Sequence, residues 1–142
     1  MITKTRSKYN NKKVTVDGIT FDSEMEYRYY KYLKQLEQQG IISEFLMQKE
    51  YIVFEGYTKD RKKVLPIKYK ADFEVHYPDN RIEVIDIKGF ETPDFKLKKK
   101  LFEYRFPFKL KLITYSKIDG GWITLDDLKK ARKERKKQKL GQ

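Results

Sequence analysis

The chain has 142 residues and a mass of 17.2 kDa, which suits one domain with a core of its own. It contains no cysteine and a single histidine, His76, so a disulfide scaffold, a cysteine zinc site, thiol catalysis and a histidine-rich metal site are excluded. No apolar run approaches the ~20 residues of a membrane span, and the N-terminus has no apolar signal segment. We therefore expect a cytoplasmic protein that does not contact a membrane.

The net charge of +12 comes from the two ends of the chain. Residues 1–13 carry five basic side chains and no acid, and residues 129–142 carry eight basic side chains against Glu134. Residues 14–128 hold 20 basic and 20 acidic side chains. We therefore predict a basic N-terminal arm (1–13), a folded domain (14–128) and a basic C-terminal helix or tail (129–142). Such ends favour a polyanionic partner, although solvated tails that aid solubility would have the same composition.

The first half of the chain predicts a hairpin, a helix and short strands. Residues 14–21 flank Asp17-Gly18, a hairpin-turn dipeptide. A helix is expected from Ser23, which forms a capping box with Glu26, and Gly40 ends it. Residues 41–54 are apolar and β-prone and predict two short strands, whereas residues 56–63 predict a charged turn region. One long strand is expected over residues 68–77.

The second half predicts a sheet centre and two more helices. Residues 81–88 follow a turn and are apolar on both faces, as in a central strand. Thr92-Pro93 opens a helix that ends before Pro107, residues 108–112 alternate as a half-buried strand, and Thr124 caps a basic helix. The order predicts an α/β fold with a mixed central sheet flanked by helices. The second helix is expected to bury Phe95, Leu97, Leu101, Phe102 and Tyr104.

Charged side chains in the most apolar predicted strand indicate a functional site. Asp86 and Lys88 share one face of that strand, and buried charges are costly unless they are paired or bind a metal. If residues 78–80 form a three-residue loop, Asp72 falls opposite Asp86; a two-residue loop would turn it away and leave Glu74 or Glu83 as alternatives. Oxygen-only ligands suit Mg²⁺ or Mn²⁺. An ordinary Asp–Lys ion pair in a hairpin would explain the same residues without a metal.

Glu26 is the third candidate carboxylate, in the first turn of the first helix. It is also the third helical residue of the capping box, which by itself accounts for an acid at that position. One carboxylate cannot fully serve both roles.

A glutamate on a helix, an aspartate on a strand and D-x-K on the next strand resemble the core of the PD-(D/E)XK nucleases. The flanking blocks are similar to a family of small phage and prophage proteins assigned to that superfamily, over residues 8–113. The layout also resembles phage Holliday-junction-resolving endonucleases and the end-cleaving subunit of some transposases. Two departures are Ala71 in place of proline before Asp72, and Asp86 where glutamate is more usual. The matching blocks are residues 21–29, 69–73, 84–89 and 96–102.

The resemblance implies a metal-dependent endonuclease that hydrolyses DNA. Asp72, Asp86 and the Ile87 carbonyl would bind Mg²⁺ or Mn²⁺, Glu26 would bind it directly or through water, and Lys88 would orient the attacking water. Junction resolution would need two active sites and therefore a homodimer. A DNA-binding module on the same fold that does not cut is the alternative function, and an interaction protein that recruits its partner through the basic helix is a third. The expected DNA-binding side chains are Lys12, Lys13, Lys96, Lys98, Lys100, Lys133, Arg135 and Lys136.

Overall fold

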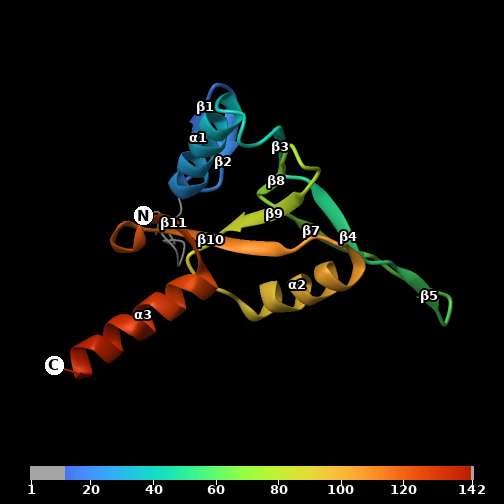
Figure 1. Cartoon of the computed structure of the whole chain (residues 1–142). Coiled ribbons are helices and arrows are strands. Elements are labelled where there is room, and N and C mark those ends of the chain that lie inside the picture. Colours follow the sequence, from blue (N-terminus) through green and yellow to red (C-terminus); the bar gives the residue numbers. More distant parts are fainter. Residues whose placement is uncertain (1–11, 142) are drawn as a thin grey trace, which may run out of the picture.

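The computed structural model describes residues 12–141 and has a central five-stranded sheet between helices (Figure 1). The helices are α1 (Glu24–Gln38), α2 (Pro93–Arg105) and α3 (Leu125–Leu140). The strands are β1 (Val14–Val16), β2 (Ile19–Phe21), β3 (Glu44–Met47), β4 (Glu50–Phe54), β5 (Tyr57–Lys59), β6 (Lys62–Val64), β7 (Ile67–Lys70), β8 (Phe73–His76), β9 (Ile82–Ile87), β10 (Leu110–Ser116) and β11 (Gly121–Thr124). The predicted α/β class and mixed sheet are confirmed.

The sheet has the order β11-β10-β9-β8-β3. Only β9 and β10 are parallel, and α2 makes the crossover between them. The other neighbours in the sheet are antiparallel. The central strand β9 is buried along almost its whole length, as its continuous apolar run predicts.

Alternate residues of the central strands point to two separate cores. On one face, Ile85 packs with Tyr29 and Leu33 of α1. On the other face, Val84 packs with residues of α2 and α3, including Phe102. The two-stranded ribbon of β4 and β7 adds Tyr51, Val53 and Tyr69 to this second core. The sheet is therefore covered on both faces, as an α/β sandwich requires.

The helix ends follow the predicted caps. The Glu26 N–H donates to the Ser23 hydroxyl (3.1 Å), and the Asp127 N–H donates to the Thr124 hydroxyl (3.1 Å). Thr92 caps α2 in the same way. Gly40 follows the end of α1 with a φ of 74°, which glycine adopts without steric cost.

Four expectations about the elements were wrong. The strand expected over 68–77 is split into β7 and β8, because the chain leaves β4 at Ala71 and Asp72 and joins β3 and β9. The charged turn expected over 56–63 contains the hairpin of β5 and β6, and the edge strand β11, which begins at the second glycine of Gly120-Gly121, was not expected. Leu97 and Tyr104 are exposed, because they lie about 200° around α2 from the buried Phe95 and Phe102.

No helix within residues 12–141 is long and apolar enough to cross a membrane.

Candidate metal and nucleic-acid site

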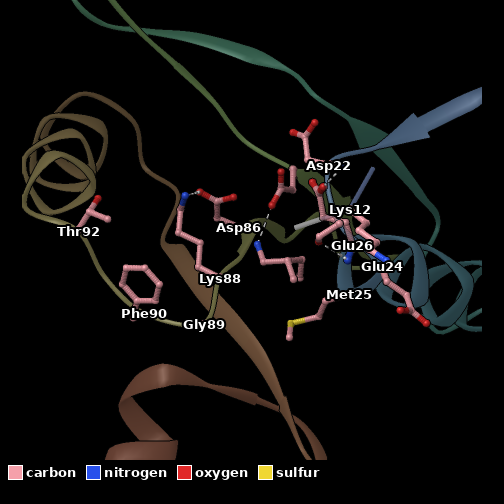
Figure 2. A pocket seen from close by; sticks show the side chains of 13 residues that line it. Lys12, Asp22, Glu24, Met25, Glu26, Asp86, Lys88, Gly89, Phe90 and Thr92 are labelled. Carbon is pink, nitrogen blue, oxygen red and sulfur yellow. Dashed lines mark hydrogen bonds and ion pairs between the residues drawn. The ribbon is translucent and has the colours of Figure 1, made fainter. Parts of the chain in front are cut away.

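An open cleft of about 590 Å³ lies where the N-terminal turn of α1 meets the carboxyl end of β9. Figure 2 shows Asp86 and Lys88 on one side of it, with Glu26 and Asp22 on the other. Asp72 lines the same cleft, so the structure brings together all four predicted catalytic residues, Glu26, Asp72, Asp86 and Lys88. The side chains and backbone that line it are Lys12, Asp22, Ser23, Glu24, Met25, Glu26, Asp72, Asp86, Ile87, Lys88, Gly89, Phe90 and Thr92.

The register of β8 and β9 places Asp72 opposite Asp86. Phe73 pairs with Ile85, so continuing the antiparallel register by one residue aligns the two aspartates. The three-residue loop on which this depends is present, since the Tyr77 N–H donates to the Arg81 carbonyl (2.9 Å). The predicted geometry is therefore confirmed, and Glu74 and Glu83 are not needed as alternatives.

Three carboxylates of the cleft, those of Asp72, Asp86 and Glu26, accept hydrogen bonds from protein donors. Asp72 Oδ2 accepts the Ile87 N–H (2.7 Å), and Asp86 Oδ2 accepts the Tyr69 hydroxyl (2.5 Å). Glu26 Oε2 accepts the Asp22 N–H (2.8 Å). These bonds fix the orientation of the three side chains before any ligand arrives.

Glu26 combines a local structural role with a place in the cleft. Its carboxylate reaches the Asp22 N–H rather than the Ser23 N–H, so the reciprocal bond of the capping box is displaced by one residue. Its second oxygen, Oε1, accepts from Gln48 Nε2 (3.3 Å). The residue is 3% exposed, which is deep burial for a helix-capping acid.

The carboxylates make the cleft strongly acidic at its base. Asp72, Asp86 and Glu26 are 9%, 4% and 3% exposed. Burial, followed by the proximity of Asp86 and Glu26, raises the pKa of Asp72 well above its ordinary value. Gathering negative charge here is unfavourable unless a proton or a cation offsets it.

The donor atoms of these three side chains are of the type that a hard divalent cation prefers. All three side chains offer carboxylate oxygens, which Mg²⁺ and Mn²⁺ prefer, and Ile87 lines the same cleft. Within residues 12–141, no group of three or more histidine, cysteine, aspartate or glutamate side chains is arranged so that it could hold a metal ion. The case for a metal therefore rests on the type of donor atom and on the convergence of the three side chains at one cleft.

Lys88 introduces a positive charge at the edge of this acidic base. Its Nζ lies 3.6 Å from Asp86 Oδ2, and its side chain is 36% exposed. Figure 2 shows the lysine beside Asp86, with its amine toward that carboxylate. An amine so placed can reach both the carboxylate and a ligand in the cleft.

A smaller cleft of about 380 Å³ adjoins the same aspartates and is lined by more cations. Lys68 and Lys70 come from β7, and Lys98 comes from α2. Lys98 Nζ also lies 3.5 Å from Asp94 Oδ2. An anionic chain that reached Asp86 from this side would meet positive charge first.

The other predicted DNA-binding residues do not gather at the clefts. Lys12 lines the larger cleft and Lys98 the smaller one, but the remaining six line neither. Arg135 instead pairs with Asp119. Residues 1–11 of the predicted N-terminal arm lie outside the described part of the chain. The six side chains away from both clefts are Lys13, Lys96, Lys100, Lys133, Arg135 and Lys136.

Four further residues that build the site were not expected from the sequence. Tyr69 and Gln48 position Asp86 and Glu26, and Lys68 and Lys70 supply cations. The alternation of Lys68, Tyr69 and Lys70 was a usable signal, because it places a buried hydroxyl beside exposed lysines two residues before Ala71-Asp72. The role of Gln48 could not be predicted, because it depends on the left-handed backbone conformation that Gln48 itself adopts between β3 and β4 (φ 56°).

A family model described as "Protein of unknown function (DUF1064)" matches residues 6–133. The match covers most of the 142 residues, so the chain belongs to this family. No curated protein and no solved structure matches the chain.

Proposed function

We propose that this protein is an Mg²⁺- or Mn²⁺-dependent endonuclease that hydrolyses phosphodiester bonds in DNA. The observation that supports this most is the convergence of Asp72, Asp86 and Glu26 with Lys88 in one open cleft. The adjoining lysines support a polyanionic substrate. An ordinary Asp–Lys ion pair accounts for Asp86 but not for Asp72, the second buried aspartate that lies opposite it.

The side chains divide the chemistry between them. Asp72, Asp86, Glu26 and the Ile87 carbonyl would bind the metal ion, which would activate water and stabilise the charge on the phosphate. Lys88 would orient the attacking water and offset the negative charge of the scissile phosphate. Water attacks phosphorus, the bond to the 3′ oxygen breaks, and the products carry 5′-phosphate and 3′-hydroxyl ends. Tyr69 positions Asp86 through its hydroxyl.

The first test is cleavage of labelled DNA by wild type and Asp86→Asn. Linear duplex, single strands, flaps and four-way junctions are incubated with Mg²⁺, Mn²⁺ or EDTA. We expect cutting that requires the metal and falls at least about 100-fold in Asp86→Asn, because a charged group that acts on the transition state is removed. The ranking of substrates then reports whether branched DNA is preferred.

Glu83→Gln is the matched control for this test. Glu83 is a buried carboxylate on the same strand, but it bonds to Tyr77 and Lys111 and lines neither cleft. Glu83→Gln should retain cutting at a temperature where wild type, Asp86→Asn and Glu83→Gln are all folded. Cutting that continues in EDTA or in Asp86→Asn would contradict the proposal, and binding without cutting in wild type would favour a non-catalytic DNA-binding module.

A preference for junctions would further require two sites in one assembly. A homodimer therefore remains a prediction, and sedimentation with and without a four-way junction measures it.

A further inference from the structure

The hairpin of β5 and β6 extends beyond the body of the molecule (Figure 1). Its turn residues Asp60 and Arg61 have φ values of 53° and 64°, as in the two-residue loops that join the strands of tight hairpins. Every residue from Tyr57 to Lys63 is exposed, so the hairpin contributes nothing to either core. Its projection needs an explanation other than packing.

The charge of the hairpin is unfavourable for the isolated protein. Lys59 and Lys62 are direct cross-strand partners, and like charges in that position repel. Arg61 and Lys63 add to the same cluster, whereas Asp60 is the only acid between residues 57 and 64. Among the described residues 12–141, none of these four cations forms an ion pair. A polyanion would remove this repulsion.

Two contacts lie at the base of the hairpin, and one of them connects it with the rest of the fold. A Cβ on Gly56 would lie 2.4 Å from the Val64 carbonyl oxygen, so the two strands pass closer there than any other residue permits. Glu55 is bound to Arg105 at the end of α2 (2.6 Å). The hairpin is therefore tied to the helix that also supplies Lys98 to the smaller cleft.

Strand β7 connects the hairpin with the candidate site. It follows the hairpin, carries Lys68 and Lys70, and ends two residues before Asp72. The eleven residue steps from Arg61 to Asp72 can span at most roughly 40 Å when extended. One turn of B-DNA is about 34 Å long. The hairpin tip therefore lies no farther from Asp72 than about one turn of duplex DNA.

We propose that the β5–β6 hairpin binds double-stranded DNA that flanks the cleavage point. A two-stranded ribbon fits the major groove, and its cations would contact the phosphates on either side. The lysines of β7 continue this contact toward the cleft. The inference rests on the proposed function, because it assumes a DNA substrate, and it adds that the substrate has a duplex arm beside the cut.

The test compares two charge-matched triple variants. The hairpin variant is Lys59→Gln, Arg61→Gln and Lys62→Gln. The control variant is Lys34→Gln, Arg81→Gln and Lys109→Gln, which removes the same residue types from surfaces that line neither cleft. Affinity for a 30-base-pair duplex and for a single strand of equal length is measured in EDTA over a range of salt.

We expect the hairpin variant to bind the duplex at least about tenfold more weakly than wild type. Its slope of log affinity against log salt should fall by about 0.9 for each phosphate that the variant no longer neutralises. The single strand should be less affected, and the control variant should change duplex affinity less than about threefold, because its three cations lie outside the hairpin and line neither cleft. Equal reductions in both variants, or on both substrates, would overturn the inference.

Lys62→Glu separates binding from folding. It replaces the repulsion with Lys59 by attraction, so the melting temperature should not fall while duplex affinity does. If the hairpin variants bind duplex as wild type does and Asp86→Asn still abolishes cutting, the hairpin inference fails and the proposed function stands. If the hairpin variants lose duplex binding and wild type never cuts, the hairpin inference stands and the proposed function fails.

Discussion

Asp72 and Glu83 are buried carboxylates of the same sheet with opposite effects on stability. Asp72 lies near two other acids, and burial and those acids raise its pKa. Burial alone would also raise the pKa of Glu83, but hydrogen bonds from Lys111 and Tyr77 outweigh it and lower that pKa. The charge of Asp72 therefore opposes folding without a cation, whereas the charge of Glu83 supports it.

Asp72→Asn should stabilise the metal-free protein. The raised pKa means that the folded state holds a proton that the unfolded state loses above about pH 4, so stability falls as pH rises from there. At pH 8 in EDTA, urea unfolding should give the variant at least about 1 kcal/mol more stability than wild type. Added Mg²⁺ should stabilise wild type only. A variant less stable than wild type at pH 8 would contradict this.

Glu83→Gln should destabilise the protein at neutral pH. The lowered pKa means that the stabilisation is complete above the ordinary carboxyl pKa and is lost as pH falls through the lowered value. Removing a buried charged acceptor should cost about 1–3 kcal/mol at pH 7. Thermal unfolding from pH 7 to pH 3 should show this difference shrinking, and a constant difference would exclude the charge as its cause.

At the scale of elements, the first turn of α1 links helix capping with the candidate site. Ser23 holds the Glu26 N–H, and the Glu26 side chain in turn holds the Asp22 N–H. The same turn therefore starts the helix and positions a candidate ligand. The C-terminal helix α3 has an equivalent cap, Thr124, which lines neither cleft.

Ser23→Ala should lower both stability and metal affinity. Losing the cap should cost about 1 kcal/mol, and the fraying turn should loosen Glu26. Thr124→Ala should lose similar stability without changing metal affinity. Calorimetric titration with Mn²⁺ beside thermal unfolding measures both quantities, and equal metal affinity in all three proteins would remove Glu26 from the ligand set.

At the scale of the whole molecule, two basic elements extend in different directions. The hairpin and α3 lie at opposite ends of the view in Figure 1, with the sheet between them. Beyond Leu125 and Leu128, α3 buries no residue. The last part of this helix is thus available for contacts outside the fold.

Removing residues 136–142 should leave stability within about 0.5 kcal/mol of wild type, since the truncation takes away no core residue. The truncation removes Lys136, Lys137 and Lys139, which lowers the net charge from +12 to +9. Duplex affinity should become less dependent on salt, by up to about 0.9 in slope for each phosphate that these lysines neutralise in the intact chain. An unchanged slope would show that this end of α3 does not touch DNA.

The sequence by itself determined the helix caps, and it indicated the four candidate catalytic residues that the structure brings to one cleft, Glu26, Asp72, Asp86 and Lys88. Caps at Ser23, Thr92 and Thr124 depend on contacts between near neighbours, so residue type and spacing suffice to predict them. The sequence left open whether the loop before Arg81 has two or three residues, and the structure decides for three, which aligns Asp72 with Asp86.

Only the tertiary structure decided how strands divide and what anchors the acids. The strand predicted over residues 68–77 is interrupted at Ala71 because β7 and β8 pair with different strands. The alternation of buried and exposed residues along one strand does not show which strands it pairs with. Gln48 reaches Glu26 across 22 residues, and Tyr69 reaches Asp86 across 17. Such contacts depend on how distant elements pack, whereas sequence periodicity reports only which face of one element is buried.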